Sequence, residues 1–212
     1  MSNLSELTPK PARDRSDLMV ICDLVEPDTK VLDVGCGNGE LLELLANRKN
    51  VDARGVEISQ EGVNRCVMKG LSVVQGDADT DLETYPDKAF DYVIMSHTIQ
   101  ATDRPRDVLR QMMRIGKRAI VSFPNFAHWL VRFQIGIKGH MPITETLPIP
   151  WYETPNVHFC SIRDFDALVT ELGADVERKI GFDSRGRRLE GPGAGFLANL
   201  RAERAVFVLE KP

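Results

Sequence analysis

The sequence predicts an α/β fold built on a doubly wound, mostly parallel seven-stranded sheet with an antiparallel last strand. Short stretches rich in apolar and β-branched residues alternate along the chain with stretches of helical periodicity. Most predicted strands are apolar almost continuously, which is typical of strands covered by helices on both faces of a parallel sheet. No helix is expected between the last two strands, so they are predicted to form an antiparallel pair at one side of the sheet.

Local signals place the individual elements. Each expected strand is a short apolar run, and these runs cover residues 30–34, 51–58, 71–77, 89–96, 117–123, 175–182 and 204–211. Each expected helix carries apolar residues on one face, and these helices cover residues 17–25, 39–47, 60–70, 105–115 and 162–172. Pro105 and Gly116 flank one of these helices as a first-turn proline and a terminating glycine. Ser161 and Asp164 form a capping-box start for another.

Length and composition indicate one globular domain. The chain has 212 residues, of which 42% are hydrophobic and 27% charged, so it can bury a substantial core. Residues 1–13 contain two prolines and few large apolar groups, so we expect a loose tail there and a single domain over residues 14–212. The net charge of −4 argues against a protein that binds nucleic acid or an anionic membrane.

The cysteines and histidines indicate a reduced compartment and no metal site. The four cysteines are scattered without a CxxC pair, and with the four histidines they show no metal-ligand spacing. The N-terminal stretch lacks the apolar core of a signal peptide, and no apolar run approaches the roughly 20 residues that span a bilayer. We therefore expect a cytoplasmic protein.

An insert at about residues 124–160 breaks the alternation of strands and helices. It contains both tryptophans and five of the twelve prolines of the chain. One interpretation is an extra helix over residues 126–137 that packs on the core and is followed by a proline-stiffened connection. The other is a lid, a substrate pocket or a docking surface, because long ordered insertions in compact domains are often functional. The sequence alone leaves both open.

A glycine-rich turn follows the first strand in the stretch VLDVGCGNGELL, residues 31–42. A phosphate-binding P-loop needs Lys and then Ser or Thr after its last glycine, but Gly39 is followed by Glu40 and Leu41. The dinucleotide fingerprint needs a third small residue where Glu40 stands. A carboxylate at that position would also compete with a pyrophosphate for the amides of the helix N-terminus. Phosphate ligands are therefore disfavoured.

The remaining pattern is D-x-G-x-G-x-G, formed by Asp33, Gly35, Gly37 and Gly39. It resembles the first motif of the class I S-adenosylmethionine-dependent methyltransferases. Glycines let the backbone approach the methionine part of that cofactor closely, and Asp33 supplies negative charge near its cationic end. The turn residues Cys36 and Asn38 complete this part of the predicted site for S-adenosylmethionine or S-adenosylhomocysteine.

Acidic residues at the next two strand ends extend the prediction. Glu57, followed by Ile58, ends the second strand about 20 residues after the turn, where an acid can accept both ribose hydroxyls. Asp77 ends the third strand, and the resemblance implies that it meets the adenine amino group while Ala78 faces the ring edge. The fourth strand ends at Ser96, where the methyltransferases line the methionine pocket.

Evidence for a catalytic group is thinner than evidence for a cofactor. The sequence SHTIQ after the fourth strand lacks the Asn-Pro-Pro-aromatic motif of nucleobase amino-methyltransferases. His97 is the best-placed candidate base, since methyl transfer sometimes requires removal of a proton from the acceptor. A single histidine near a pocket is more often a packing or hydrogen-bonding residue than a base. Its role is therefore left open.

The stretches SFPNFAHW, GHMPIT, LPIPWYETPNVHFCSIRDF and AVFVLEK resemble the methionine biosynthesis protein MetW family from about residue 15 to the end. The resemblance implies the class I methyltransferase fold and a role at the homoserine O-acyltransferase step, alongside the acyltransferase MetX. Two hypotheses follow. The protein is an accessory or regulatory partner of the acyltransferase that binds S-adenosylmethionine and docks through the insert. Alternatively, it is an active S-adenosylmethionine-dependent methyltransferase whose insert encloses a small-molecule acceptor.

Overall fold

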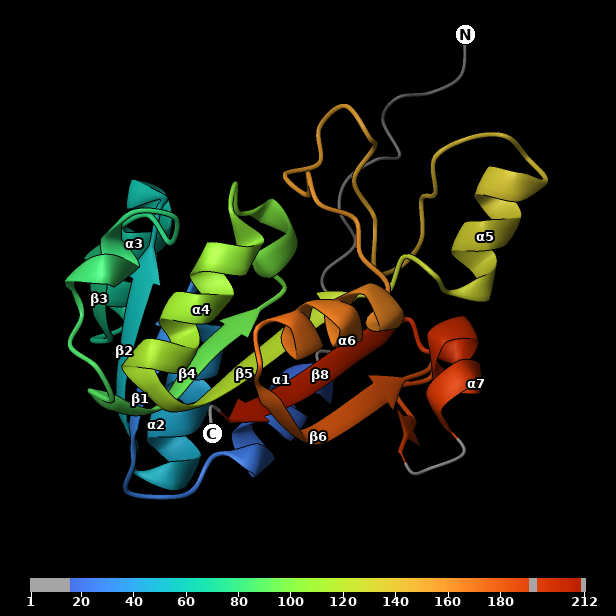
Figure 1. The fold of residues 1–212 in the computed structure, drawn as a ribbon. Coiled ribbons are helices and arrows are strands. Elements are labelled where there is room, and N and C mark those ends of the chain that lie inside the picture. Colours follow the sequence, from blue (N-terminus) through green and yellow to red (C-terminus); the bar gives the residue numbers. More distant parts are fainter. Residues whose placement is uncertain (1–15, 191–193, 211–212) are drawn as a thin grey trace, which may run out of the picture.

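The computed structural model describes residues 16–190 and 194–210 and shows one sheet with helices on both faces (Figure 1). The loose tail expected over residues 1–13 lies outside the described residues. The sheet has the order β3-β2-β1-β4-β5-β8-β6-β7. Its strands are β1 (Lys30–Val34), β2 (Asp52–Glu57), β3 (Ser72–Gln75), β4 (Phe90–Ser96), β5 (Gly116–Pro124), β6 (Asp175–Phe182), β7 (Arg188–Leu189) and β8 (Arg204–Glu210).

The pairing of the strands confirms the predicted doubly wound topology. Strands β1 to β5 pair in parallel, and Asp33 of β1 lies between Gly55 of β2 and Ile94 of β4. The last strand, β8, is antiparallel to both β5 and β6, as predicted. The eighth strand was not predicted, because it is only the two residues of β7 paired with the end of β6.

The prediction that no helix separates the last two strands was wrong. Helix α7 (Ala194–Arg201) lies between β6 and β8 in sequence and contacts α6 in space. Its start overlaps the stretch GPGAG at residues 191–195, whose glycines and proline disfavour helix on propensity alone. Ala198 and Ala202 are buried beneath its last turns, so tertiary packing outweighs the local preference.

Two apolar cores cover the two faces of the sheet. One face carries α4 (Pro105–Ile115) and α6 (Ile162–Glu171), whose Met112 and Phe165 pack with Phe123 and Phe207 of the strands. The other face carries α1 (Ser16–Leu24) and α2 (Glu40–Lys49), and its core includes Ile21. Helix α3 (Gln60–Met68) packs beside β2 and β3. This covering on both faces explains the nearly continuous apolar strands.

The insert leaves the sheet at the end of β5 and contains helix α5 (Trp129–Gly136). The helix lies within the expected range 126–137, but only Val131 of it is buried, and Trp129, Phe133 and Ile135 are exposed. Figure 1 shows α5 standing away from the sheet. Two hydrogen bonds between the Gln134 side chain and the backbone of Ile143, of 3.2 and 2.9 Å, connect α5 to the following loop.

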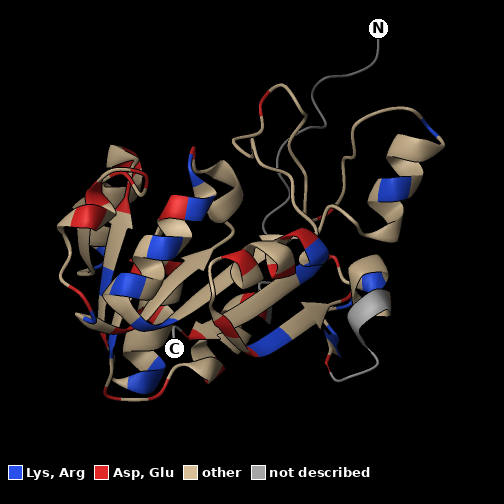
Figure 2. Cartoon of the chain, viewed as in Figure 1, with Lys and Arg blue, Asp and Glu red and all other residues tan. Residues whose placement is uncertain are grey.

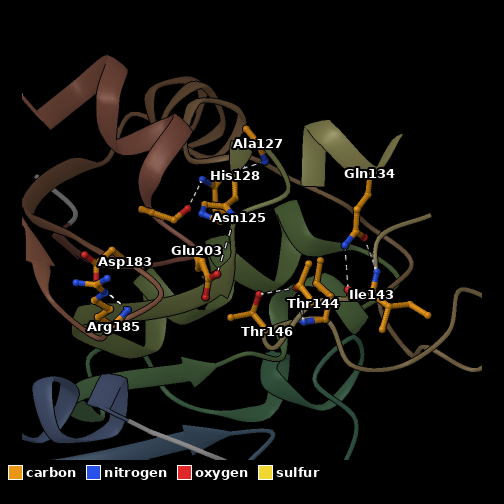
Figure 3. A network of polar contacts seen from close by, with 12 residues as sticks. Asn125, Ala127, His128, Gln134, Ile143, Thr144, Thr146, Asp183, Arg185 and Glu203 are labelled. Carbon is orange, nitrogen blue, oxygen red and sulfur yellow. Dashed lines mark hydrogen bonds and ion pairs between the residues drawn. The ribbon is translucent and has the colours of Figure 1, made fainter. Parts of the chain in front are cut away.

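A buried asparagine holds the base of the insert (Figure 3). The Asn125 side chain donates to the carbonyl oxygens of Asn199 and Ala202, at 3.0 and 2.7 Å. Its oxygen accepts from the backbone amides of Ala127 and Ile162, at 3.1 and 3.3 Å. One side chain thus joins the end of β5, the insert, the start of α6 and the end of α7.

Two buried titratable residues, His128 and Glu203, form backbone hydrogen bonds with this asparagine. His128 Nδ1 and Glu203 Oε1 lie 4.0 Å apart, which is too far for a hydrogen bond. Burial raises the pKa of the Glu203 carboxyl and lowers the pKa of the His128 imidazole. Both shifts favour the neutral form, because removing a charge from water is costly.

The Asn125→Ala variant is expected to lose roughly 2–4 kcal/mol of unfolding free energy, because it leaves two buried carbonyls and two amides without their partner. Urea denaturation measures this loss. The matched control is Asn64→Ala on the exposed side of α3, where the side chain accepts one hydrogen bond from Gln60. Equal losses in the two variants would show that Asn125 does not organise the base of the insert.

Candidate functional site

The candidate cofactor residues gather at the carboxyl edge of the parallel strands. The glycine turn follows β1, and Glu57, Asp77 and Ser96 stand at or just after the ends of β2, β3 and β4. The amides of Gly35 and Cys36 donate to the carbonyl oxygen of Val56, at 2.8 and 3.2 Å, so the turn is fixed against β2. This edge is where ligands bind in open parallel sheets.

The three glycines of the turn have left-handed backbone, with φ of 74° at Gly35, 56° at Gly37 and 75° at Gly39. A Cβ atom at Gly35 would lie 2.5 Å from Thr98 Cγ2, and one at Gly39 would lie 2.4 Å from Leu71 Cδ1. A Cβ atom at Gly37 would meet nothing within 4 Å. The outer glycines are therefore required by packing, whereas the middle one faces open space where a ligand can approach the backbone.

Cys36 and Asn38 occupy opposite sides of the turn. Cys36 is buried with Leu42 and Cys66, and burial raises the pKa of both thiols, so they are neutral packing groups. The Asn38 side chain is exposed and accepts a hydrogen bond of 2.9 Å from Arg65. Neither side chain has a contact that distinguishes it as a ligand group, so their place in the site stays a prediction.

Glu57 ties the glycine turn to the start of α3. Its side chain is buried, with Oε2 accepting from the Gly37 amide at 2.8 Å and Oε1 accepting from the Ser59 amide at 2.9 Å. Each carboxylate oxygen has a further lone pair, so contact with ribose hydroxyls is compatible with these bonds. Ile58 beside it is exposed. The ribose contact itself stays a prediction.

The turn after β3 is built from acidic side chains that bind backbone amides. Asp77 Oδ1 accepts from the Asp79 amide at 2.9 Å, and the Asp77 amide donates to Asp81 Oδ2 at 2.8 Å. Asp79 in turn accepts from the amides of Asp103 and Arg104 at the start of α4, both at 2.8 Å. Ala78 packs against the core. The predicted adenine contacts of Asp77 and Ala78 remain predictions.

His97 has a more specific environment than the sequence indicated. Ser96 Oγ lies 3.2 Å from Ser122 Oγ, and the His97 amide donates to the Ser122 carbonyl at 2.9 Å. His97 Nε2 lies 2.7 Å from Asp17 Oδ2, and Asp17 Oδ1 accepts from Arg204 Nη1 at 3.2 Å. No sequence pattern indicates this cluster, because its members lie 80 and 187 positions apart.

A cavity connects His97 to the insert. It has a volume of about 230 Å³, and His97 lines it together with aromatic, aliphatic and proline side chains of residues 124–159. On the other side of His97, Thr98 Oγ1 lies 3.5 Å from the Gly35 carbonyl oxygen. The residues after β4 therefore join the glycine turn to the insert cavity.

Within residues 16–190 and 194–210, no group of three or more His, Cys, Asp and Glu side chains could hold a metal ion. Among the helices of the described chain, none has both the length and the apolar character that crossing a bilayer requires.

The packing around the turn predicts unequal effects of adding the same methyl group. Gly35→Ala is expected to lose roughly 1–3 kcal/mol more unfolding free energy than Gly37→Ala, because only the former collides with the stiff, β-branched Thr98. Both variants place an alanine in a left-handed backbone conformation, so the difference between their unfolding free energies isolates the effect of the collision. Urea denaturation of the two variants measures it, and equal losses would contradict the packing described for Gly35.

The comparisons with known proteins agree with this architecture. The chain is 32% identical over 201 residues to the bifunctional methionine biosynthesis protein MetXA/MetW of Rhodopirellula baltica, covering 90% of this chain and 32% of that relative. A methyltransferase structure from Archaeoglobus fulgidus matches with a TM-score of 0.65 and 21% identity, covering 92% of each chain. One from Mesorhizobium loti matches with a TM-score of 0.67 and 13% identity, covering 92% of this chain and 98% of that one.

Both structures are described as S-adenosylmethionine-dependent methyltransferases, and at these identities they establish the fold alone. The bifunctional relative is about three times longer than the matched region, so its complete activity does not transfer directly. The sequence profile of the family described as methionine biosynthesis protein MetW matches residues 15–209. The chain has the class I methyltransferase fold and belongs to the MetW family of methionine biosynthesis proteins.

Proposed function

We propose that this protein binds S-adenosylmethionine at the glycine turn and acts in methionine biosynthesis as an accessory or regulatory partner of homoserine O-acyltransferase. Membership of the MetW family supports the pathway. The exposed apolar surface of the insert is the observation that carries the partnership.

The residues at the strand ends fit S-adenosylmethionine better than a phosphate ligand. The open space at Gly37 suits close approach to the backbone, whereas the carboxylates of Glu57 and Asp77 would repel phosphate. The backbone of the turn would hold the methionine part, Glu57 the ribose, Asp77 and Ala78 the adenine, with Ser96 near the methionine pocket. When bound, this cofactor supplies an electrophilic methyl group.

Glu57→Ala is expected to weaken S-adenosylmethionine binding by roughly 10- to 100-fold, through loss of hydrogen bonds to a charged acceptor. Isothermal titration calorimetry measures the affinity. Glu61→Ala is the matched control, because Glu61 lies in the first turn of α3 with its side chain 75% exposed. Because Glu57 also binds two amides, Asp77→Asn provides a second variant should Glu57→Ala fold poorly. Unchanged affinity in both would show that the cofactor site is placed wrongly.

The insert presents an unusual concentration of exposed apolar side chains. Those that are at least a third exposed are Trp129, Phe133, Ile135, Ile137, Met141, Ile143, Ile149, Trp151, Tyr152, Val157 and Phe159. Figure 2 shows few charges on this segment compared with α4 and the sheet. Exposed apolar groups gathered in this way are typical of protein interaction sites.

The relative from Rhodopirellula baltica indicates which partner to test. It combines MetXA and MetW in one chain. Fusion raises the effective concentration of two modules that work together, so separate chains with the same roles need a surface that brings them together. The MetX component corresponds to the acyltransferase implied by the family resemblance. The apolar outer surface of the insert supplies a suitable contact.

The partnership predicts that Ile137→Ser/Tyr152→Ser disrupts a complex with the homoserine O-acyltransferase of the same organism. These side chains are 75% and 65% exposed. Truncating apolar contacts at the centre of an interface typically weakens binding by tenfold or more, so we expect roughly that loss in gel filtration and calorimetry. The matched control is Val67→Ser/Met68→Ser, with side chains 58% and 80% exposed on α3.

Acyl transfer is then measured with and without this protein. The proposal expects the acyltransferase to depend on the wild-type protein and not to respond to the Ile137→Ser/Tyr152→Ser variant. An acyltransferase that is equally active alone, together with no detectable complex, would overturn the partnership. That outcome would not bear on the proposed cofactor site, because the docking surface lies in the insert and the cofactor residues lie at the strand ends.

An active methyltransferase is the second candidate function. The cavity lined by His97 and the insert favours it, because an accessory role requires an outer surface but no recess for a small molecule. The two functions share the cofactor edge and differ in their use of the insert. The chemistry of the cavity therefore decides whether a small molecule also binds this protein.

A further inference from the structure

We propose that the cavity beneath the insert binds a small, largely apolar molecule bearing a hydroxyl or amine group. His97, oriented by Asp17, accepts the hydrogen bond from that group. This inference deepens the second candidate function, and only its chemical step rests on the proposed binding of S-adenosylmethionine. Binding of the molecule itself depends on the cavity and on His97 alone.

The walls of the cavity define the apolar part of the ligand. Phe126 and Phe159 stack with their ring centroids 4.1 Å apart, and Met141, Ile149 and Trp151 complete much of the lining. The volume of about 230 Å³ is smaller than that of typical drug-sized sites. Among the described residues that line it, His97 is the one ionisable side chain. The lining also includes the uncharged polar side chains of Thr146, Thr154 and Asn156, so the cavity suits a compact neutral molecule that is largely apolar and places a polar group at His97.

The hydrogen bonds of His97 determine which ring nitrogen can accept. Asp17 is 1% exposed and uses Oδ1 for Arg204 and Oδ2 for His97 Nε2. A carboxylate held by a guanidinium is an acceptor, so Nε2 is the nitrogen that donates to it, and in the tautomer with a single ring hydrogen Nδ1 carries the lone pair. Within the described residues, no hydrogen bond to Nδ1 is formed. Nδ1 is therefore left to accept from a ligand.

The backbone supports a specific role for this side chain. His97 has a φ of 58°, a left-handed conformation that is unfavourable for a residue with a side chain. The hydrogen bond from the His97 amide to the Ser122 carbonyl oxygen and the hydrogen bond between the His97 ring and Asp17 hold the residue in that conformation. Its neighbour Thr98 contacts the carbonyl of Gly35, so the residue next to His97 in the chain reaches the glycine turn. A ligand group at His97 would thus lie on the cofactor side of the cavity.

The same geometry accounts for the proton in a methyl transfer. With S-adenosylmethionine held at the glycine turn and Glu57, the cofactor would supply its methyl group, the ligand oxygen or nitrogen would form the bond to that methyl carbon, and the carbon–sulfur bond would break with its electron pair left on sulfur. The ligand proton would move to His97 Nδ1, and Asp17 would stabilise the imidazolium. Asp17 is a positioning residue in this scheme, since it contacts His97 and not the reacting atoms.

The test uses two probes of the same shape, 4-methylphenol and p-xylene, which differ by a hydroxyl in place of a methyl group. Binding to the full chain without cofactor is followed by NMR titration, and the nitrogen shifts of His97 report its tautomer. The wild-type protein is expected to bind 4-methylphenol roughly tenfold more tightly than p-xylene, with a shift at Nδ1. Equal affinity for the two probes, or binding of neither, would overturn the proposal.

Two variants separate hydrogen bonding from structure. In Asp17→Asn, the amide oxygen faces Arg204 and the amide NH2 faces His97, so the imidazole is expected to carry its hydrogen on Nδ1. The hydroxyl of 4-methylphenol then accepts from Nδ1–H instead of donating to Nδ1, so the direction of the shift at Nδ1 is expected to reverse while p-xylene binding changes little. His97→Gly removes the imidazole and tolerates the left-handed backbone, so it is expected to lose the preference for 4-methylphenol and serves if Asp17→Asn folds poorly. A purely structural role for His97 predicts that the preference survives in His97→Gly.

S-adenosylmethionine affinity is measured on the same variants by calorimetry. The proposal expects it to be unchanged, because the glycine turn and Glu57 are intact. Loss of the probe preference with normal cofactor binding supports the cavity site. A failure of cofactor binding in the wild-type protein would instead overturn the proposed cofactor function and leave the result with the probes standing.

Discussion

The carboxyl edge of the sheet depends on the hydrogen bonds that the Glu57 carboxylate accepts. Glu57 stands at the end of β2, accepts from Gly37 in the turn after β1, and accepts from Ser59 at the start of α3. Hydrogen bonds to an ionised acceptor are among the strongest available, so one side chain fixes three segments. Gly62 has to lack a side chain for this, because a Cβ atom there would lie 2.8 Å from Glu57 Cγ.

The insert depends on an equivalent arrangement at the end of β5. Asn125 fixes the point where the insert leaves the sheet, and the Gln100 carbonyl oxygen accepts from the amides of Val157 and His158 where it returns. The Gln100 side chain also donates to the Pro124 carbonyl oxygen at 3.1 Å. Both ends of the insert are therefore held close to the end of β5. The segment between them can be rich in exposed apolar groups without losing its place over His97.

The parts of the structure that sequence reasoning predicted are those set by local patterns. The glycine turn, the acids at successive strand ends and the antiparallel last strand all follow from periodicity and spacing. Helix α7 was missed because GPGAG opposes helix locally while Ala198 and Ala202 are buried by contacts distant in sequence. The pairing of His97 with Asp17 depends on α1 folding against the end of β4. No pattern within either segment encodes that contact. The contact with Asp17 nevertheless changes the interpretation of His97 from an isolated histidine to one whose ring is oriented by a buried carboxylate.

The insert has an inner and an outer surface, and Trp151 belongs to both. It lines the cavity, its side chain is nevertheless 69% exposed, and its ring contacts Tyr152 edge-on with centroids 5.8 Å apart. Tyr152 lies on the outer surface and does not line the cavity. A molecule within the cavity and a protein on the outer surface would therefore meet across two adjacent rings. Because coupling between sites requires differential contacts with each ligand, this ring pair is where a small molecule and a protein partner could influence one another.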